Sequence, residues 1–282
     1  MIFDRNEQKQ VVALLGAGSM GTAIVRRIGA GKKILLGDIS DKALERVGED
    51  FRRSGYDVET IQVNALQKES VEAFARKAAE LGPVMYVIDT AGASPNQAKP
   101  EHIVDLDMVG TGYAVDAFGE VMAQGGAGLI ISSQAAYMYP IPNDIELQLV
   151  NTPTEGLKEV KFIQEVAMQN SGWAYMIAKR VNHLQAMKAA ATTWKARRAR
   201  INTLSPGIIL TPLAYDEFDA AGEGYQRMID ASAAERVGTS DEIAEAGALL
   251  LGEHAGFITG TDLLIDGGTI AAIRTGQYKL GR

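Results

Sequence analysis

Tyr175 and Lys179, a tyrosine and a lysine four residues apart, are the residues of this chain whose types and spacing could do chemistry together. On a helix, positions i and i+4 share one face, so the lysine ammonium can lie beside the phenol and favour its ionised form. A tyrosine in that position can exchange a proton near neutral pH. The pair alone is weak evidence, because most tyrosines are packing residues with a polar hydroxyl. Its interpretation depends on the surrounding sequence.

A glycine-rich turn lies near the start of the chain, where Gly16, Gly18 and Gly21 follow the apolar run 11–15 in G-x-G-x-x-G spacing. In a dinucleotide-binding turn the first glycine permits the tight turn, the second lets the backbone approach the pyrophosphate, and the third allows close helix packing. The helical pattern that follows, at 20–28, would direct a helix N-terminus at the anion. The turn therefore predicts a bound dinucleotide.

Asp38 closes the next predicted strand, about 20 residues beyond the glycines, where a carboxylate can accept hydrogen bonds from the adenosine ribose hydroxyls. Its charge would repel a 2′-phosphate, and no Arg or Lys between Gly16 and Gly21 offsets that repulsion. NAD(H) is therefore expected rather than NADP(H). The alternative is that Asp38 only caps the following helix.

The same turn allows a second interpretation, because the segment 17–21, with Ser19 at its centre, is similar to the nucleophile elbow of hydrolases. That chemistry needs a histidine base and an acid, and the elbow normally follows a central strand rather than the first one. His102, His183 and His254 lie far apart, with no recognisable catalytic or metal-ligand spacing. We therefore expect neither a hydrolase nor a metal site.

The chain has 282 residues, of which 46% are hydrophobic and 22% charged, as is typical of a folded globular protein. Its net charge of -7 disfavours nucleic acid or an anionic membrane as the main partner. The basic cluster Lys195, Arg197, Arg198 and Arg200 falls where a long helix should end, a place that the helix dipole favours. The absence of cysteine excludes disulfides and thiolate sites. With no signal-like N-terminus and no apolar run long enough for a membrane span, a cytoplasmic location is expected.

Short apolar runs alternate with helical patterns along the chain, which is typical of βαβ units that form a parallel sheet. We expect one doubly wound α/β domain over residues 1–282, with a seven-stranded parallel sheet flanked by helices. The strands are expected at 11–15, 33–37, 59–63, 84–90, 128–132, 200–204 and 263–266. The helices are expected at 20–28, 42–53, 70–81, 101–122, 173–195 and 241–251.

Further motifs, in a fixed order, make the chain similar to the short-chain dehydrogenase/reductase family over nearly its whole length. Residues 89–92 (Asp-Thr-Ala-Gly) stand where the family has Asn-Asn-Ala-Gly, and residues 107–110 (Asp-Met-Val-Gly) where it has Asn-Leu-x-Gly. Ser133 ends a strand like the family's catalytic serine, and Tyr175 with Lys179 matches its Y-x-x-x-K motif. The remaining segments that resemble the family's cofactor-binding and C-terminal motifs are 201–207 with Thr211, 236–243, 257–260 and 265–268.

The resemblance implies a single Rossmann domain and an NAD(H)-dependent oxidoreductase that interconverts a secondary alcohol and a ketone by hydride transfer. Tyr175 would be the general acid and base, Ser133 would hold the substrate oxygen, and Lys179 would lower the pKa of Tyr175 and bind the nicotinamide ribose. Asp107 replaces an asparagine that holds a proton-relay water, a role that the family assigns partly to a backbone carbonyl. The implied cofactor-binding residues are Gly16, Gly18, Ser19, Met20, Gly21, Asp38, Asn64, Ala65, Thr90, Ala91, Gly92, Tyr175, Lys179, Pro206, Gly207, Ile209 and Thr211.

The chain departs from the family at several positions. The family spaces its glycines as T-G-x-x-x-G-x-G, whereas the spacing here is shorter. Asp89, Thr90 and Asp107 replace asparagines, and Asn64 replaces an aspartate near the adenine. An alternative function is therefore an NAD(H)-binding sensor or scaffold of the same fold without turnover, although the intact serine, tyrosine and lysine argue against it.

The segment 137–172, between the catalytic serine and Tyr175, is longer than the loop usual in the family. Ile145, Leu147 and Leu149 alternate as in an extended stretch, and Thr154 can cap a helix that follows. An insertion with this many apolar side chains must bury them. It is therefore either a lid over the substrate or an interface with a neighbouring subunit. We expect a homodimer or homotetramer.

The substrate is expected to be a small alcohol or ketone, apolar or cyclic. Its pocket should be lined by the residues after Ser133 and by the segment 213–236, where Tyr215, Phe218, Tyr225 and Met228 offer apolar contacts. Hydroxysteroids, other cyclic alcohols and hydroxyacyl thioesters all agree with this expectation.

Overall fold

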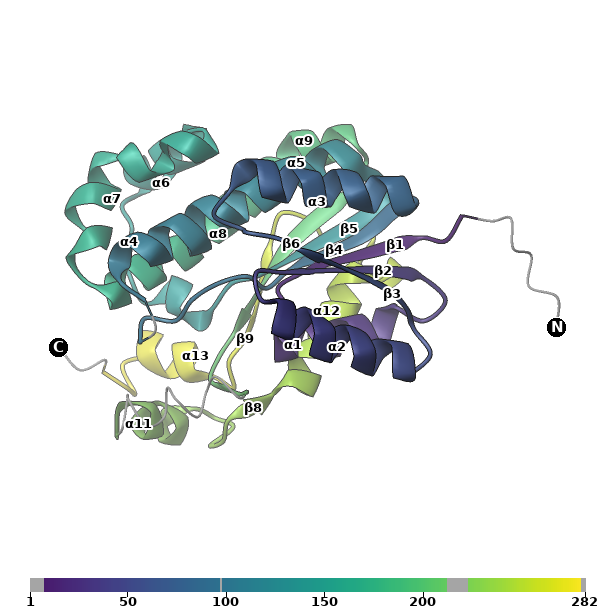
Figure 1. Ribbon diagram of the computed structural model, residues 1–282. Helices are drawn as coiled ribbons and strands as arrows, with labels where there is room; N and C mark the ends of the chain where they lie inside the picture. The colour runs from purple at the N-terminus through teal and green to yellow at the C-terminus, as the bar shows by residue number, and fades with distance from the viewer. Residues whose placement is uncertain (1–7, 97, 212–222, 280–282) are drawn as a thin grey trace.

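The computed structural model describes residues 8–96, 98–211 and 223–279. Its centre is a seven-stranded parallel sheet in the order β3-β2-β1-β4-β5-β6-β9, which confirms the predicted doubly wound α/β fold (Figure 1). The strands are β1 (Val11–Leu15), β2 (Lys33–Asp38), β3 (Asp57–Gln62), β4 (Val84–Asp89), β5 (Met122–Ile131), β6 (Arg200–Pro206) and β9 (Asp262–Ile265).

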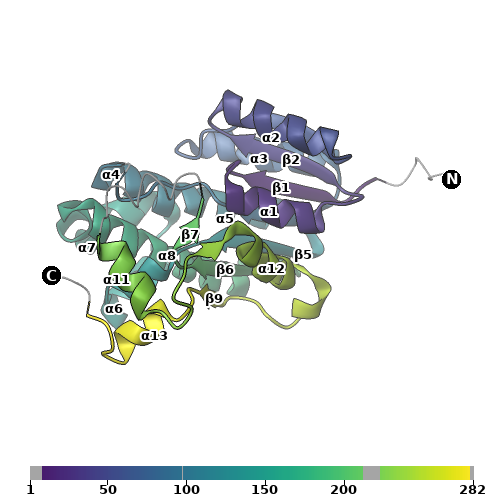
Figure 2. The same cartoon turned by 90° about the horizontal axis from the view of Figure 1, so that it is seen from below.

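Helices cover both faces of this sheet (Figures 1 and 2). One face carries α1 (Ser19–Ile28), α2 (Asp41–Arg53) and α12 (Ser240–Leu251), and the other carries α3 (Lys68–Leu81), α5 (Thr111–Val121) and α8 (Ser171–Ala191). In β1, Val11, Ala13 and Leu15 pack into the core on one face, and Val12 and Leu14 into the core on the other. A strand buried on both faces has a continuous apolar sequence, which is why its position was predictable.

The sheet has a switch point between β1 and β4, because β1 pairs with β2 on one side and with β4 on the other. Backbone hydrogen bonds join the end of β1 to the ends of both β4 and β2. Thr90 N donates to the Leu15 carbonyl at 2.8 Å, and Gly16 N donates to the Gly37 carbonyl at 2.8 Å. In open parallel sheets, ligands bind beyond the carboxyl ends of the strands at such a point.

Two of the predicted helices are interrupted. The helix expected at 101–122 consists of α4 (Pro100–Ile103), a π-helical segment η1 (Val104–Gly110) and α5. The helix expected at 173–195 ends at Ala191 and is followed by the short α9 (Thr193–Ala196). A π-helical turn shifts the backbone hydrogen bonds by one residue, and the hydrophobic pattern of the sequence does not record that shift.

The insertion 137–172 is mostly helical, so the extended stretch predicted within it is wrong. It contains α6 (Asn143–Asn151), the 3-10 segment η3 (Thr154–Glu159) and α7 (Lys161–Glu165). In α6, Leu149 is buried whereas Leu147 is 64% exposed, as expected for a helix and not for a strand. Thr154 does not cap a helix with its side chain, because its hydroxyl donates to Asp116 at 2.6 Å.

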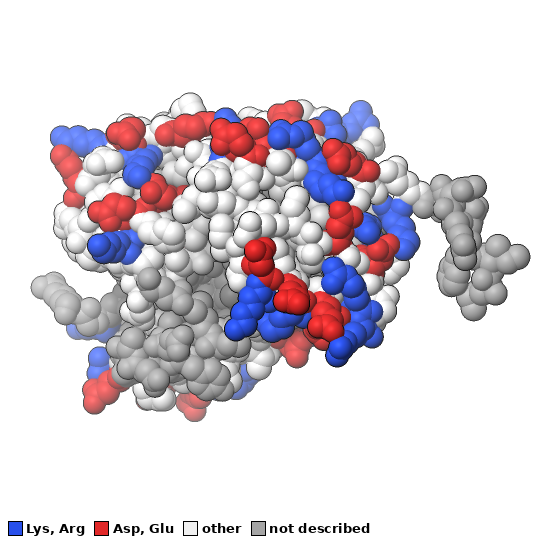
Figure 3. Space-filling view, viewed as in Figure 1, with Lys and Arg blue, Asp and Glu red and all other residues white. Residues whose placement is uncertain are grey.

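Several smaller elements lie outside the main sheet and its covering helices. The two-residue strands β7 (Ile209–Leu210) and β8 (Gly238–Thr239) pair in parallel and are too short to leave a sequence pattern. Near the C-terminus lie α11 (Glu223–Ala231) and α13 (Thr269–Arg274). On the face drawn in Figure 3, acidic and basic side chains are interspersed. Among the described residues, no helix is long and apolar enough to cross a membrane, and no group of metal-ligating side chains is assembled.

Candidate active site

The glycine turn joins β1 to α1 at the switch point of the sheet. Gly16 has a φ of +94°, and a Cβ there would lie 2.6 Å from Thr90 Oγ1, so the position requires glycine. Gly18 is the N-cap of α1, and its Cβ would meet no atom within 4 Å, so the backbone is open to a ligand. A Cβ at Gly21 would lie 2.7 Å from the Leu14 side chain, so this glycine allows α1 to pack on the sheet. The three glycines have the three environments that a pyrophosphate-binding turn needs.

A cleft of about 600 Å³ opens beside this turn, at the carboxyl ends of β1, β2 and β4. Its size is within the range of small-molecule and cofactor sites. The lining residues that the sequence analysis did not predict are Leu15, Ala17, Ile39, Arg46, Val63, Leu66, His102 and Leu106. The predicted cofactor-binding residues that line it are Gly16, Gly18, Ser19, Met20, Asp38, Asn64, Ala65, Thr90, Ala91, Gly92 and Thr211.

The Asp38 carboxylate ties the glycine turn to the end of β2. Its Oδ2 accepts a hydrogen bond from Ala17 N at 2.7 Å, and its Oδ1 accepts one from Ser40 N at 2.8 Å. Ser40 is the cap of α2, since its hydroxyl accepts from Ala43 N at 3.2 Å. The alternative that Asp38 serves only as the helix cap is therefore wrong. Each carboxylate oxygen retains a second lone pair with which it could accept from a ligand.

A second cavity of about 390 Å³ adjoins this cleft and shares Met20, Thr90, Gly92 and Thr211 with it. Gly21 is the one predicted site residue that lines neither space, in agreement with its packing role. The other predicted residues that line the second cavity are Asp107, Ser133, Tyr175, Lys179, Pro206, Gly207 and Ile209. The fold thus brings the predicted catalytic set to one cavity beside the cofactor cleft.

Ser133 and α8 present the reactive side chains to this cavity. Ser133 follows β5 and caps a 3-10 turn, η2 (Gln134–Tyr137), whose Ala135 N donates to its hydroxyl at 3.1 Å. Helix α8 begins after Asn170, whose side chain accepts from Trp173 N at 2.8 Å. On this helix, Lys179 Nζ lies 5.4 Å from the centre of the Tyr175 ring. The i and i+4 spacing thus places the ammonium beside the ring, whereas its effect on the ionisation of Tyr175 stays a prediction.

The Lys179 ammonium is buried and forms an ion pair with Asp107. Nζ lies 3.1 Å from Asp107 Oδ2, and the two side chains are 6% and 0% exposed. Asp107 Oδ1 accepts from Ala93 N at 2.8 Å. Burial opposes the charge of Lys179, but Asp107 and Tyr175 outweigh this effect and raise the pKa of Lys179. Burial also raises the pKa of Asp107, against the attraction of the Lys179 ammonium.

The π-helical segment η1 presents Asp107 to α8. Asn182 Nδ2 donates to the Asp107 carbonyl at 2.7 Å, and Gln185 Nε2 donates to the Met108 carbonyl at 2.9 Å. The backbone carbonyls of residues 107 and 108 are thus both held by side-chain donors of α8. A Cβ at Gly92 would lie 3.0 Å from Asp107 Oδ2, so this glycine leaves room for the carboxylate.

Asp89 is a second carboxyl group buried beside the ion pair. It is 2% exposed, its Oδ1 accepts from Ala91 N at 3.0 Å, and its Oδ2 has no hydrogen-bond partner among the described residues. Burial raises the pKa of Asp89 to about 7, with Lys179 opposing the rise and Asp107 adding to it. The ammonium of Lys179 thus has one carboxyl group at ion-pair distance and another within range of its field.

We predict that Asp89→Asn stabilises the protein above about pH 7. The Asp89 pKa is about 7 in the folded state and its ordinary value is 3.8, so the folded state binds more protons between these pH values. Stability therefore falls as the pH rises through this window, and the full penalty, about 4 kcal/mol, is present above it. Urea unfolding of both proteins below and above the window measures the difference. A variant with the same stability difference at both pH values would contradict the prediction.

A separate polar network lies around Asp262 of β9. The Tyr137 hydroxyl donates to its Oδ2 at 2.6 Å, Ser205 Oγ donates to its Oδ1 at 2.8 Å, and His183 Nε2 lies 3.2 Å from Oδ1. Ser205 also contacts His183 Nε2, whereas His183 Nδ1 faces Arg180 at 3.3 Å. A serine–histidine–aspartate relay needs its two partners on opposite ring nitrogens. This network therefore joins α8, β6 and β9 and has no hydrolase geometry.

The insertion 137–172 packs on a face of α8 that turns away from the catalytic cavity. Its Leu149, Leu157 and Ile163 belong to the same core cluster as Ile177 and Val181 of α8. Of the described residues in this segment, those that line the catalytic cavity are Met138 and Gly172, at its two ends. The insertion contributes mainly to the core around α8.

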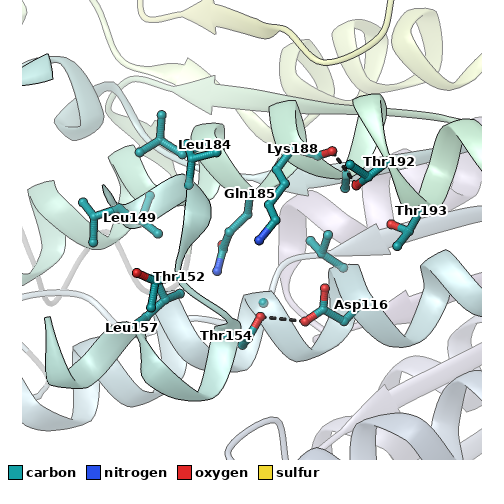
Figure 4. Close-up of a pocket in the computed structure, with 15 residues that line it drawn as sticks. Asp116, Leu149, Thr152, Thr154, Leu157, Leu184, Gln185, Lys188, Thr192 and Thr193 are labelled. Carbon is teal, nitrogen blue, oxygen red and sulfur yellow. Dashed lines mark hydrogen bonds between the residues drawn. The ribbon is translucent and has the colours of Figure 1, made fainter. Parts of the chain in front are cut away.

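Polar contacts also fix the insertion in place. Beside a small cavity of about 80 Å³, Thr154 Oγ1 donates to Asp116 of α5 at 2.6 Å (Figure 4). Lys158 of η3 pairs with Asp105 of η1 at 2.6 Å. A lid would have to break these contacts and expose the apolar cluster in order to move. The roles of lid and subunit interface both stay predictions.

We predict that Ile163→Ala destabilises the protein by about 2–4 kcal/mol, because the side chain is fully buried and its removal leaves a cavity. Leu147→Ala, in the same segment but 64% exposed, is the matched control and should change stability by less than about 0.5 kcal/mol. Denaturant unfolding measures both changes. An unchanged KM for Ile163→Ala is expected of a fixed support, and a raised KM would favour a lid.

The wall of the second cavity is largely apolar. Tyr225 and Met228 of α11 line it as predicted, and Met138 and Met176 add two further thioether side chains. The predicted contacts Tyr215 and Phe218 lie outside the described residues. Among the described lining residues, the charged side chains are Asp107 and Lys179, which pair with each other.

Comparison with known proteins agrees with this geometry. Residues 10–143 match the family model described as short chain dehydrogenase, and residues 160–269 match the one described as enoyl-(acyl carrier protein) reductase. A short-chain dehydrogenase/reductase of Alternaria brassicicola, bsc3, is 37% identical over 93% of this chain and 96% of its own length. Galactitol 2-dehydrogenase of Cereibacter sphaeroides is 26% identical over 91% of this chain and 93% of its own. The 7alpha-hydroxysteroid dehydrogenase of Bacteroides fragilis is 25% identical over 94% and 96%.

Solved structures share the fold. A short-chain dehydrogenase/reductase from Serratia marcescens superposes with a TM-score of 0.73 at 22% identity, covering 93% of this chain and 98% of that one. A Rossmann-type sheet with a glycine turn and a serine–tyrosine–lysine cavity defines a nicotinamide-dependent oxidoreductase. The chain belongs to the short-chain dehydrogenase/reductase family.

Proposed function

We propose that the chain is an NAD(H)-dependent oxidoreductase that interconverts a secondary alcohol and a ketone. The observation that supports this most is the convergence of Ser133, Tyr175 and Lys179 on one cavity that adjoins the glycine-turn cleft. The residues of that cleft fit a dinucleotide, because Gly16 allows the tight turn against Thr90 and Gly18 leaves the backbone open to a ligand. The N-terminus of α1 points into the same space and favours a pyrophosphate there.

In this proposal the dinucleotide, when bound, supplies the acceptor or donor of the hydride. Tyr175 takes the proton of the alcohol during oxidation and returns it to the oxygen during reduction. The Ser133 hydroxyl holds the same oxygen and stabilises the charge that develops on it. Lys179 lies one turn beyond Tyr175 on α8, and its ammonium lies beside the Tyr175 ring, where its charge acts on the phenol.

We predict that Tyr175→Phe lowers kcat by roughly 10²–10⁴-fold, the usual contribution of a general acid and base. NADH affinity should stay within a few-fold, because the hydroxyl acts in the chemical step. Tyr113→Phe is the matched control, since Tyr113 lies on α5 and lines neither the cleft nor the catalytic cavity. Steady-state rates and NADH fluorescence titrations measure the two quantities. Turnover at the wild-type rate in Tyr175→Phe would exclude the mechanism.

The preference for NAD(H) is assigned to the Asp38 carboxylate, whose charge would repel a 2′-phosphate. Arg46 of α2 lines the same cleft and would act in the opposite sense, because a guanidinium binds phosphate. The two side chains thus make opposed contributions to the choice of cofactor. The Asp38 carboxylate is held against the glycine turn, because its Oδ2 accepts a hydrogen bond from Ala17 N.

We predict that Asp38→Asn lowers the ratio of kcat/KM for NAD⁺ over NADP⁺ by roughly 10- to 100-fold, since a hydrogen bond to a charged group contributes about 1.5–3 kcal/mol. The asparagine retains an oxygen that can accept from the glycine turn. Arg46→Ala should move the ratio in the opposite direction. Kinetics with each cofactor at one alcohol concentration give the ratios. An unchanged ratio in Asp38→Asn would mean that its carboxylate serves the turn alone.

The substrate is proposed to be an uncharged, apolar alcohol or ketone, because the described cavity wall offers methionine and tyrosine side chains and no unpaired charge. Relatives named for a polyol and for a hydroxysteroid suggest the first compounds to assay. A panel of cyclic and acyclic secondary alcohols, monitored by NADH absorbance, tests the proposal. Tight NADH binding without turnover on any of them would support the sensor alternative instead.

A further inference from the structure

The ion pair of Lys179 with Asp107 has an electrostatic consequence for Tyr175. A neutral asparagine at position 107 would leave the ammonium uncompensated, and its field would favour the phenolate. Here a carboxylate oxygen lies 3.1 Å from Nζ, and both groups are removed from water, so little solvent screens either charge. The pair presents a dipole to the phenol in place of a full positive charge.

We propose that Asp107 is a positioning residue that cancels much of the Lys179 field at Tyr175, so that the phenol keeps its proton at neutral pH and alcohol oxidation reaches its full rate only at alkaline pH. This inference rests on the proposed function. Reduction needs the protonated phenol as its acid, whereas oxidation needs the phenolate as its base. Holding the proton on Tyr175 therefore extends the pH range of reduction upward and moves the profile of oxidation to alkaline pH.

Two further titratable groups lie near the ion pair, Asp89 and His102, and neither restores a full positive charge beside Tyr175. Asp89, at the end of β4, adds a second negative charge once it ionises, near pH 7. His102 of α4 interacts with Asp107 through its charge, but it is exposed to solvent and its effect is screened. No other charged side chain lines the described part of the cavity. The net charge facing Tyr175 thus becomes more negative as the pH rises.

The geometry holds Lys179 and Asp107 together from several sides. Ala93 N fixes one carboxylate oxygen, and the Ile131 carbonyl accepts from Lys179 Nζ at 3.4 Å. Asn182 fixes the backbone of residue 107 through its carbonyl. Because no rearrangement is needed to form the pair, the cancellation is a permanent property of the site.

The test is the pH dependence of kcat/KM for a secondary alcohol and for its ketone in Asp107→Asn. Removing the negative charge of Asp107 should lower the apparent pKa of both profiles by about one pH unit, because one nearby unit charge changes the pKa of a neighbouring group by roughly that much. Alcohol oxidation should therefore reach half of its plateau at a pH about one unit lower than in the wild type. Asp105→Asn is the matched control, because Asp105 lies in the same π-helical segment but pairs with Lys158 on the surface.

An Asp107→Asn profile that coincides with that of the wild type would overturn the inference, provided that NADH binding shows the variant to be folded. If that variant does not fold, the same profiles are measured in Asp89→Asn. Their apparent pKa is expected to be lower than in the wild type, because the variant lacks the negative charge that Asp89 carries above its own pKa. An unchanged apparent pKa would overturn the inference. An active Tyr175→Phe would instead reject the proposed function itself. The two failures are therefore distinguishable.

Discussion

The pairing of β1 with both β2 and β4 is the constraint on which the rest of the structure depends. It makes the strand order reverse at one point, and both neighbouring turns then open in the same direction. The glycine turn follows β1 and Thr90 follows β4, with their backbones hydrogen-bonded across the gap. Ser133 follows the next strand, β5, so that the cofactor cleft and the catalytic cavity adjoin.

A buried ammonium is the second determinant of the site. An unpaired charge in such a position would be strongly destabilising, so a lysine on the inner face of α8 requires a partner. Asp107 is that partner, and Gly92 makes room for it. The aspartate at position 107, where the family has asparagine, thus brings a charge that pairs with Lys179.

Features with a local pattern were predictable from sequence, and features that depend on backbone hydrogen-bond offsets were not. The apolar run of β1, the spacing of Gly16 and Gly18 and the helical spacing of Tyr175 and Lys179 each determine their own structure. The helix α6 was missed because three alternating apolar residues are compatible with a strand when their burial is unknown. Arg46 was missed as a cleft residue because only the glycine turn itself was searched for cations.

The π-helical segment also divides one long helix into two parts that differ in phase. A π-helical turn contains about one residue more than an α-helical turn, which corresponds to a rotation of about 100° around the axis. Deleting a single residue between Val104 and Gly110 would therefore restore a continuous α-helix with regular hydrogen bonds. The same deletion would turn either α4 or Asp107 away from its present neighbours. The extra residue of this segment thus makes the helix less regular, but it is needed to keep both α4 and Asp107 in their present positions.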